Sequence, residues 1–511
     1  MITKILNTEQ IRRLDAYTIE NEPISSIDLM ERASTAFVKW FISHFDVEHS
    51  VRIFVGLGNN GGDGLAIARL LTEEKYQVQV DIIWYSDSVT EDFKSNYNRL
   101  PQLVRKIEIH SMDEMKSYYT TQEFTNTIYI DALLGSGLSR KPEGLIAEVI
   151  QYINESNNKI VSVDIASGLY ADKTTEHRVV VNPNYTIAFQ IPKLAFFLPQ
   201  NSKYVGEWNL VDIGLSSKFI KEEKTDKYLI EKNYIKGIYR KREKFSHKGT
   251  YGRALLVAGS FGKIGAAVLA ANGCLRSGVG LLTVQIPSCG VEILQTSVPE
   301  AMVITGKCKK TIDPVDWKTF TPDVIGIGPG IGKDKKALKT LVEILKKFKQ
   351  PMVIDADAIN LLSENPKLLD LVPANSILTP HFKEFERLVG KVENDFHRIE
   401  KLISFSKKRN VFTILKGQHT AIVTPEGDVH FNSTGNAGMA TGGSGDVLTG
   451  ILTSLLAQGY SSIEASILGV YLHGLAGDLA ANEVGEESLV ASDIISFLGK
   501  AFLKIKSFVF R

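Results

Sequence analysis

The stretch from Asn432 to Gly450, NSTGNAGMATGGSGDVLTG, joins a glycine-rich loop to a carboxylate. An apolar run typical of a helix follows Asp446, so the loop leads into a helix N-terminus. Such a terminus leaves about four N–H groups unpaired and carries partial positive charge, which favours a bound anion such as phosphate. Glycine lets those amides converge on one point. The candidate anion-binding residues are Gly442, Gly443, Ser444 and Gly445.

Asp446 has two possible roles at this helix start. It can cap the helix, as Asp commonly does, or it can be a base held beside a phosphate acceptor. We favour the base, because so many glycines in a short span exceed what a cap requires. His381 and Lys416 are candidate neighbours, although the first could be an ordinary satisfied histidine and the second a surface lysine. The loop lacks Gly-Lys-Ser/Thr and is not a Walker-type loop.

A second glycine loop, GLGNNGGDG, follows a short apolar strand predicted at 51–55. It fits the G-x-G-x-x-G pattern, and Asp81 on the next predicted strand would complete the sequence fingerprint of a dinucleotide-binding dehydrogenase. Two amides and a carboxylate in the loop argue against that reading, because pyrophosphate needs only backbone there. They suggest a site that also holds a cation or a sugar hydroxyl.

Two more predicted strands end in an aspartate and a glycine loop. Asp131 is followed by Gly135–Gly137, and Asp164 is followed by Ser167 and Gly168. A lone Asp after a strand is usually a helix cap. The carboxyl ends of parallel strands meet in one crevice, however, so two such residues facing a polar glycine loop favour a ligand site.

The elements that must position these residues repeat as strand, loop and helix throughout the chain, which predicts α/β domains with mostly parallel sheets. A length of 511 residues requires more than one domain. The segment 218–232 is charged and lacks glycine and apolar periodicity over its first half, so we interpret it as a linker between domains at 1–217 and 233–511.

Composition excludes several classes of protein. A net charge of +1 with dispersed Lys and Arg gives no electrostatic case for nucleic acid or a membrane surface. Three cysteines cannot form a disulfide framework and have no metal-ligand spacing. No signal peptide and no run of about 20 apolar residues is present, so we expect a soluble cytoplasmic protein.

Taken together, the motifs resemble those of the bifunctional NAD(P)H-hydrate repair enzymes, in which an epimerase half is fused to an ADP- or ATP-dependent dehydratase half. The resemblance covers almost the whole chain. It implies a Rossmann-like three-layer epimerase domain followed by a ribokinase-like α/β domain. The motifs are LMERAS, GLGNNGGDG, DALLGSGL, SVDIASGL, FQIPKLAFFLP, HKGTYGRALLVAGS, GIGPGIG, DADAIN, LTPHFKEFERL, LKGQHT and STGNAGMATGGSGDVLTG.

For the first half, the resemblance implies that Asp164 is the acid–base residue of the epimerase and that a potassium ion is bound through oxygen ligands. The implied potassium ligands are Asn60, Asp131 and Ser167. The implied contacts to the hydrated dinucleotide are Asp164 with Asn59, Asn60, Gly61, Gly62, Asp63, Gly135, Ser136, Gly137, Leu138, Ser139, Arg140 and Lys141.

For the second half, the resemblance implies that Asp446 is the base of the dehydratase and that ADP or ATP is the co-substrate, accompanied by Mg²⁺. The implied contacts to the hydrate are Ala266, Gly330, His381 and Asp446, although a purely structural role for Ala266 is equally compatible with the sequence. The implied nucleotide contacts are Lys416, Gly417, Gln418, His419 and Thr420 with Gly442, Gly443, Ser444 and Gly445.

The expected partners are small molecules: the hydrates of NADH and NADPH, and ADP. We also expect a homo-oligomer and no nucleic-acid or membrane partner. Two departures from the family pattern occur, since Phe382-Lys383 replaces Pro-Gly and Leu57 replaces the proline of Gly-Pro-Gly. Because of the first departure, the resemblance does not define which residues form the substrate-side wall near His381.

Two other functions fit the same residues. A ribokinase-type small-molecule kinase needs the same base and anion loop, but it releases a stable phosphorylated product. The first half could also be a nucleotide-binding or protein-binding module without catalysis. Asn60, Asp131 and Asp164 argue against the module, and the fused epimerase-like half favours repair.

Overall fold

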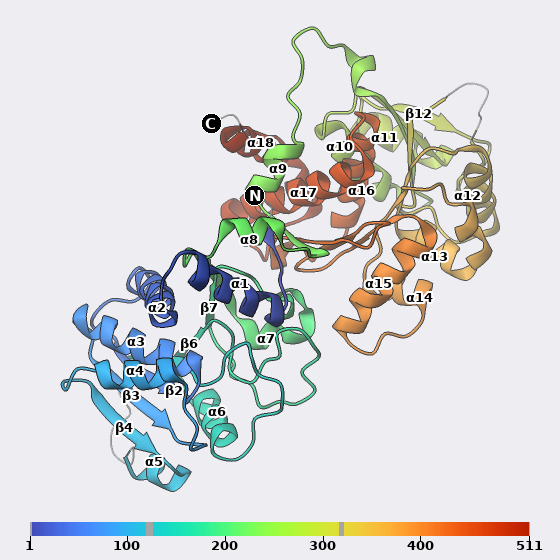
Figure 1. Cartoon of the computed structure of the whole chain (residues 1–511). Coiled ribbons are helices and arrows are strands. Elements are labelled where there is room, and N and C mark those ends of the chain that lie inside the picture. The colour runs from blue at the N-terminus through green and yellow to red at the C-terminus, as the bar shows by residue number, and fades with distance from the viewer. Residues whose placement is uncertain (1–2, 119–125, 316–320, 510–511) are drawn as a thin grey trace. The chain divides into compact units, whose positions relative to one another are not determined.

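The protein is described by a computed structural model that covers residues 3–118, 126–315 and 321–509. It contains two compact units (Figure 1). The N-terminal unit comprises Lys4–Thr225 and the short segment Asn394–Phe396. The C-terminal unit comprises Met1–Thr3, Asp226–Glu393 and His397–Arg511. The change from one unit to the other falls inside the segment 218–232, which contains the end of a short helix, α8, and a whole strand, β9.

The N-terminal unit contains a seven-stranded sheet in the order β4-β3-β2-β5-β6-β7-β8 (Figure 1). All its strand pairs are parallel, as the repeated strand, loop and helix pattern predicted. The carboxyl ends of β2, β5 and β6 are therefore neighbours at one edge. The strands are β2 (Ser50–Val55), β3 (Val78–Ile83), β4 (Arg105–Ile109), β5 (Thr127–Ala132), β6 (Lys159–Val163), β7 (Tyr185–Phe189) and β8 (Glu207–Val211).

The helices of this unit begin at side-chain caps that the sequence supplies. Asn7 and Gln10 form a capping box at the start of α1, and Ser25 and Asp28 form another at α2. Pro23 lies between the two helices, as expected from its missing N–H. The helices are α1 (Thr8–Asn21), α2 (Ser26–Ile42), α3 (Asn59–Glu73), α4 (Glu91–Arg99), α5 (Met112–Tyr118), α6 (Leu145–Glu155), α7 (Ser202–Val205) and α8 (Ser217–Glu222).

The C-terminal unit is built on an 11-stranded sheet in the order β1-β9-β18-β17-β16-β15-β14-β13-β10-β11-β12. Pairs from β12 through β16 are parallel, whereas β16, β17 and β18 are joined as antiparallel hairpins. The strands are β1 (Thr3–Lys4), β9 (Lys227–Ile230), β10 (Arg253–Val257), β11 (Leu281–Ile286), β12 (Met302–Thr305), β13 (Val324–Ile327), β14 (Val353–Ile354), β15 (Ile377–Leu378), β16 (Phe412–Leu415), β17 (Ala421–Val423) and β18 (Val429–Asn432).

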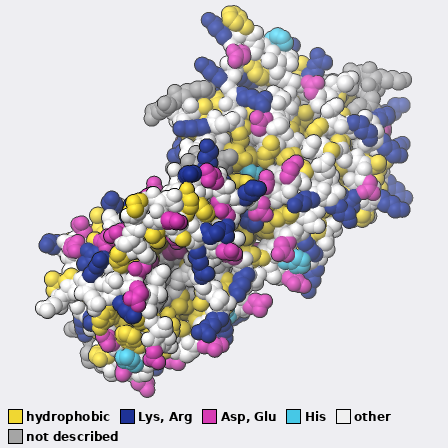
Figure 2. Space-filling view, in the orientation of Figure 1, with side chains coloured by type: hydrophobic (Ala, Val, Ile, Leu, Met, Phe, Trp, Pro, Cys, Tyr) yellow, Lys and Arg dark blue, Asp and Glu magenta, His cyan; other side chains and the backbone are white. Residues whose placement is uncertain are grey.

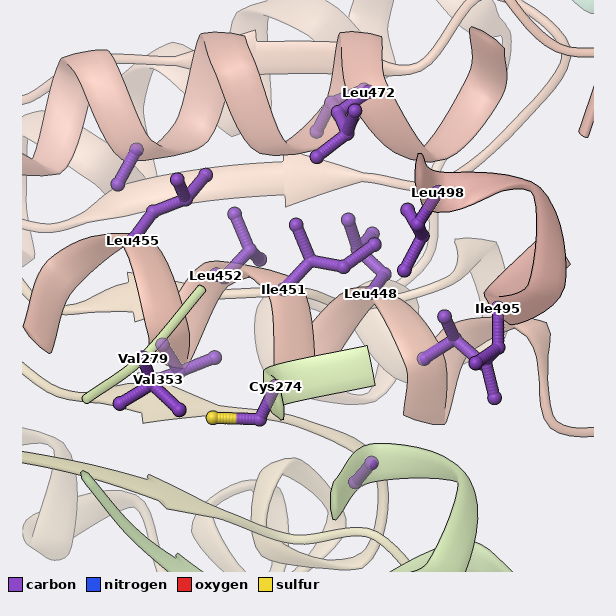
Figure 3. Close-up of a cluster of buried hydrophobic side chains, with 14 of the residues drawn as sticks. Cys274, Val279, Val353, Leu448, Ile451, Leu452, Leu455, Leu472, Ile495 and Leu498 are labelled. Atoms are coloured by element: carbon purple, nitrogen blue, oxygen red, sulfur yellow. The ribbon is translucent and has the colours of Figure 1, made fainter. Parts of the chain in front are cut away.

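Helix α16 (Ser444–Ala457) is enclosed in the core of this unit. Every residue of α16 except Gly445 and Asp446 is buried. Figure 3 shows its leucines and isoleucines beside Leu472, Ile495 and Leu498 on one side and beside Cys274 and Val353 on the other. The helix is therefore fixed around its whole circumference, and only its first turn is open.

Helix α10 approaches α16 most closely at two glycines. A Cβ on Gly450 would lie 2.0 Å from the carbonyl oxygen of Ala270, and a Cβ on Gly273 would lie 2.7 Å from that of Val447. The helices of this unit are α9 (Lys232–Ile238), α10 (Ile264–Arg276), α11 (Val291–Ser297), α12 (Lys335–Lys347), α13 (Ala356–Glu364), α14 (Phe382–Val389), α15 (Asp395–Arg409), α16, α17 (Ser462–Val484) and α18 (Ala491–Val509).

The surface carries both signs of charge. On the face drawn in Figure 2, Lys and Arg side chains alternate with Asp and Glu. Within the described ranges, none of the helices has the length and apolarity needed to cross a bilayer.

Asp81 is a structural residue of the N-terminal sheet. Its side chain is fully buried on β3 and accepts hydrogen bonds from Arg52 Nε at 2.7 Å and Gln79 Nε2 at 2.9 Å. Arg52 also donates to Tyr152 Oη at 2.9 Å and lies over the Phe54 ring. Asp81 is therefore not placed to bind a ribose hydroxyl, which removes the dehydrogenase interpretation of the first glycine loop.

We expect Asp81→Ala to lower the free energy of unfolding of the N-terminal unit by about 3–5 kcal/mol, because it leaves the Arg52 guanidinium buried without its carboxylate. Urea unfolding followed by the fluorescence of Trp40, Trp84 and Trp208, which all lie in this unit, measures the change. The double variant Arg52→Met with Asp81→Leu should recover most of the loss. A single variant as stable as the parent would contradict a structural role.

Candidate functional site

The candidate residues of the C-terminal unit follow the carboxyl ends of neighbouring parallel strands. Ser260 follows β10, Gly330 follows β13, Asp355 follows β14, His381 follows β15 and Lys416 follows β16. The main chains of His381 and Lys416 form a parallel bridge. The sheet thus brings together residues that are far apart in the sequence, as expected for an open α/β sheet.

A buried ion pair organises this edge. Lys416 Nζ lies 2.8 Å from Asp355 Oδ1, and Thr449 Oγ1 donates to Asp355 Oδ2 at 2.7 Å. Burial acts to raise the pKa of Asp355, but the charge of Lys416 and hydrogen bonds from Lys416, Thr449 and Thr379 outweigh it and lower that pKa. Asp355, which the sequence interpretation did not assign, is therefore the anionic anchor that holds the Lys416 ammonium.

Asp446 lies in the first turn of α16, as predicted, near this ion pair. Burial and then the negative charge of Asp355 raise the pKa of Asp446 to about 7, against a lowering effect of Lys416, and Asp357 raises it further. A carboxyl group that titrates near neutrality can both accept and release a proton at physiological pH. The surroundings thus lower the pKa of Asp355 and raise the pKa of the neighbouring Asp446.

The glycine loop reaches this point through a left-handed turn. Gly443 has φ of +92° and precedes the first residue of α16, so glycine is needed there. A Cβ on Gly445 would lie 3.2 Å from Lys416 Nζ, which places the first N–H groups of α16 beside that ammonium. Ser444 Oγ is 3.3 Å from Nε2 of the buried His473. The glycine loop thus supplies backbone N–H donors for an anion, and Lys416 supplies a positive charge beside them.

The segment after Lys416 forms a tight turn. Thr420 Oγ1 donates to the carbonyl oxygen of Gly417 at 3.0 Å, and Gly417 and Gln418 are exposed. His419 Nδ1 lies 3.2 Å from the carbonyl oxygen of Asn432, at the end of β18. Burial lowers the pKa of His419, so its ring is neutral near pH 7. The turn and the glycine loop therefore border the same end of the sheet.

The predicted substrate contacts Ala266 and Gly330 lie next to each other. A Cβ on Gly330, which has φ of +64°, would come within 3.1 Å of Ala266 Cβ. Ser260 Oγ donates to the carbonyl oxygen of Gly330 at 2.7 Å. Ala267 and Ala270, in contrast, are buried in the core, so only Ala266 of these alanines is partly open.

His381 is an exposed helix cap. Its Nδ1 accepts hydrogen bonds from the N–H groups of Lys383 and Glu384. In return, the His381 N–H donates to Glu384 Oε2 at 3.0 Å. Its Nε2 lies 3.4 Å from Glu384 Oε1. Burial lowers the pKa of His381, with Glu384 opposing and Lys416 assisting. The capping role does not occupy the whole ring, so a ligand contact through Nε2 stays a prediction.

In the N-terminal unit, the first glycine loop is shorter than the sequence pattern suggests. Helix α3 already begins at Asn59, so Asn59 to Asp63 form its first turn. A Cβ on Gly61 would lie 1.8 Å from the carbonyl oxygen of Gly56, and one on Gly56 would lie 1.9 Å from that of Leu133. Close backbone packing at these two glycines lets the helix start directly after β2.

Asp131 is the centre of a buried hydrogen-bond network. It accepts bonds from Ser162 Oγ at 2.7 Å, from the Ser167 N–H at 2.9 Å and from Ser167 Oγ at 2.5 Å. The Leu134 N–H donates to Ser167 Oγ at 2.8 Å. Burial raises the pKa of Asp131 despite these bonds. The carboxylate thus fixes the loop that begins at Gly135.

Asn60 borders the same loop. Its Nδ2 is buried and has no hydrogen-bond partner in the described part of the chain. A Cβ on Gly135 would lie 3.3 Å from Asn60 Cβ. A buried amide N–H₂ group with no protein partner is suited to donate to an acceptor oxygen of a bound ligand. Asn60, Asp131 and Ser167 supply the amide, carboxylate and hydroxyl groups that an alkali cation prefers.

Asp164 is held in an unusual conformation. Its φ is +64°, which is rare for a residue with a side chain. Its Oδ1 accepts a hydrogen bond from the Phe189 N–H at 3.1 Å and pairs with the buried Lys193 ammonium. Since both donors engage Oδ1, Oδ2 is left for other contacts. Lys193 lies between β7 and the 3₁₀ helix η1 (Leu194–Phe197).

Two further carboxyl groups surround Asp164. Burial and then the charge of Asp164 raise the pKa of Asp15 to about 7, while Lys193 opposes the rise. Burial, Asp164, Asp15 and Asp92 together raise the pKa of Asp63 well above its ordinary value. The predicted loop 135–141 runs beside α1, where Thr8 Oγ1 lies 3.5 Å from the carbonyl oxygen of Ser136.

The sequence interpretation did not assign Lys193 or Asp15. Lys193 was within a recognised motif, FQIPKLAFFLP, and a lysine inside an apolar run is a signal for a buried partner. Asp15 lies in a helix of alternating charge, where nothing local distinguishes it.

Comparisons with known proteins agree with this division into two parts. A family model described as YjeF-related protein N-terminus matches residues 26–195, and one described as NAD(P)H-hydrate dehydratase matches residues 254–499. A Bacillus subtilis ADP/ATP-dependent NAD(P)H-hydrate dehydratase, crystallised with ATP and Mg²⁺, is 30% identical with a TM-score of 0.49, covering 54% of this chain and 98% of its own.

Relatives also match over nearly the full length. The bifunctional NAD(P)H-hydrate repair enzyme of Moorella thermoacetica is 33% identical over 508 residues, which is 97% of this chain and 96% of the relative. That of Escherichia coli is 30% identical over 496 residues, covering 96% and 92%. With both halves matched in order and relatives covering nearly the full chain, the chain belongs to the family of bifunctional NAD(P)H-hydrate repair enzymes.

Proposed function

We propose that this chain restores hydrated NADH and NADPH in two separate steps. The C-terminal unit removes water from the S hydrate while ADP is converted to AMP and phosphate, and the N-terminal unit interconverts the R and S hydrates. The observation that carries the proposal is the first turn of α16, where the only two unburied residues of the helix, Gly445 and Asp446, adjoin the Lys416–Asp355 pair.

The dehydratase step follows from the chemistry of the leaving group. The hydrate has a hydroxyl on a ring carbon next to the ring nitrogen, and hydroxide leaves poorly. Asp446 takes the hydroxyl proton as the oxygen attacks the terminal phosphoryl group of ADP. The electrons of the ring nitrogen then expel phosphate and form an iminium, and loss of a proton from the neighbouring ring carbon restores the dihydropyridine, so that AMP and phosphate are the products.

The α16 N-terminus and Lys416 support that transfer. N–H groups at Gly443 to Gly445 and the Lys416 ammonium stabilise the charge that grows on the phosphoryl oxygens, at a few kcal/mol for each well-placed donor. Asp355 keeps Lys416 directed at this position. Mg²⁺, when bound with the nucleotide, neutralises part of the phosphate charge. Residues 416–420 and the glycine loop hold the nucleotide, and Ala266, Gly330 and His381 contact the hydrate.

In the N-terminal unit, Asp164 exchanges the proton of the same hydroxyl. Protonation releases water and leaves a planar iminium, which water can attack from either face. Residues 59–63 and 135–141 bind the dinucleotide around Asp164. The side-chain oxygens of Asn60, Asp131 and Ser167 are suited to a potassium ion, which would supply positive charge next to the phosphates or hydroxyls of the substrate. The unpartnered Asn60 Nδ2 can donate to an oxygen of the substrate.

Separate active sites predict separable losses. Asp446→Asn should lower the dehydration rate by about 10²–10⁴-fold, the usual contribution of a general base, and leave epimerisation unchanged. Asp164→Asn should do the reverse. The recovery of dihydronicotinamide absorbance with ADP measures dehydration, and chromatographic exchange of the purified epimers without nucleotide measures epimerisation. Loss of both activities in either properly folded variant would refute the division, and a persistent phosphorylated product would instead indicate a kinase.

The raised pKa of Asp446 predicts a pH dependence. Only the ionised base accepts a proton, so kcat/KM for dehydration should rise with pH, reach half its plateau near pH 7 and fall about tenfold per unit well below it. Asp357→Asn removes a negative charge that raises this pKa and should move the midpoint to lower pH. The nucleotide ionises identically in assays of the parent and of Asp357→Asn, so the difference between their two midpoints reports the titration of Asp446. Identical midpoints would contradict the assignment.

A further inference from the structure

Helix α1 lies along the substrate loop of the N-terminal unit. Thr8 Oγ1 is 3.5 Å from the carbonyl oxygen of Ser136. One turn later, a Cβ on Gly137 would lie 2.8 Å from Arg12 Nη2. Residues 8, 12 and 15 share one helix face, because their spacings are four and three. The next side chain on the face that borders the loop is therefore Asp15.

From this position Asp15 lies within electrostatic range of the Asp164–Lys193 pair. It interacts electrostatically with both members of the pair and with Asp63. It is partly buried and has no hydrogen-bond partner within the described residues. Asp164, in contrast, already accepts two bonds on Oδ1. The two carboxyl groups thus come from different elements and differ in the number of hydrogen bonds that they accept.

The helix that carries Asp15 is firmly attached. Leu14 is fully buried in a cluster with Leu6 and Ile213. The buried Thr18 donates to the carbonyl oxygen of Leu14 at 2.8 Å and accepts from the Ser216 N–H at 3.0 Å. With the capping box at its start, α1 holds Asp15 in place without a side-chain bond. The family model matched to this half begins only at residue 26, so α1 lies before it.

We propose that Asp15 is a second acid–base residue of the epimerase, acting with Asp164 on the hydroxyl of the hydrate. The inference rests on the proposed epimerase function. The protonated Asp15 gives its proton to the hydroxyl oxygen as the C–O bond breaks. The bonding electron pair leaves with that oxygen as water, and the ring-nitrogen lone pair forms the C=N bond.

The return step uses the other carboxylate. Water forms a new C–O bond at the same ring carbon, the C=N electrons return to nitrogen, and Asp164 accepts the proton that water loses. Exchange with solvent returns the proton to Asp15, so no oxidant or other reactant is consumed. Asp164, which pairs with the Lys193 ammonium, suits the acceptor role. Asp15, whose pKa burial and the charge of Asp164 raise to about 7, suits the donor role.

The test compares Asp15→Asn with Asp15→Glu in the full-length protein, using the R hydrate of NADH and chromatographic separation of epimers. Asp15→Asn should lower kcat for epimer exchange about hundredfold or more with little change in KM. Asp15→Glu, which keeps a carboxylic acid, should restore a large part of the rate. Glu20→Gln, an exposed change on the same helix, should leave exchange unchanged.

A pH profile provides the second readout. The parental rate should fall at high pH as Asp15 loses its proton, and this limb should be absent from Asp15→Asn. The charged groups that set its position are Asp164 beyond β6 and Lys193 beyond β7, and Asp63 on α3 also interacts electrostatically with Asp15. Urea unfolding followed by the fluorescence of Trp40, Trp84 and Trp208 provides the folding standard, because these residues lie in the N-terminal unit.

The outcomes are distinct. No epimer exchange by the parent protein would overturn the proposed epimerase function itself. Exchange by the parent with an Asp15→Asn rate within about threefold of it, or with the high-pH limb retained, would overturn the role of Asp15 alone. A large fall in kcat with rescue by Asp15→Glu and loss of the limb supports it.

Discussion

The close contact between α10 and α16 determines where chemistry can occur in the C-terminal unit. Gly273 and Gly450 bring the two helix backbones together, and the rest of α16 is buried among aliphatic side chains (Figure 3). A helix enclosed on every side cannot shift or rotate without disrupting a closely packed core. The N–H groups of its first turn and the Asp446 carboxyl are thereby held in fixed positions beside Lys416.

Carboxylates in both units divide into anchors and reactive groups according to their neighbours. Asp355 and Asp131 are buried and accept several hydrogen bonds, and they hold Lys416 and the loop at Gly135. Among the described residues, Asp446 and Asp15 have no such partners, and burial together with a neighbouring negative charge raises the pKa of each to about 7. Similar residue types therefore acquire different tasks from local charge and hydrogen bonding.

Much of this arrangement follows from local sequence. Apolar strands ending in Asp or glycine loops predicted both mainly parallel sheets and the edge at which the candidate residues meet, because parallel strands leave their carboxyl ends on one side. The helix start at Asp446 was predicted from the change of pattern, and α16 indeed begins at Ser444.

Other features depend on contacts that no local pattern contains. Helix α3 begins at Asn59, earlier than the pattern suggested, because Gly61 packs on the backbone of Gly56. The pairing of Lys416 with Asp355 joins residues 61 positions apart, and the approach of Asp15 to Asp164 depends on how α1 lies against a distant loop. Long-range pairing of this kind is determined by topology and side-chain packing, which period and spacing do not specify.

The charge balance around α16 has a consequence for ligand association. Asp355, Asp357 and Asp446 carboxyl groups share this region with the Lys416 and Lys263 ammonium groups. A polyphosphate that settles against Asp446 adds negative charge and makes its ionised form less favourable still. Nucleotide association is therefore linked to proton uptake from the buffer, and the heat released on mixing depends on the ionisation enthalpy of that buffer.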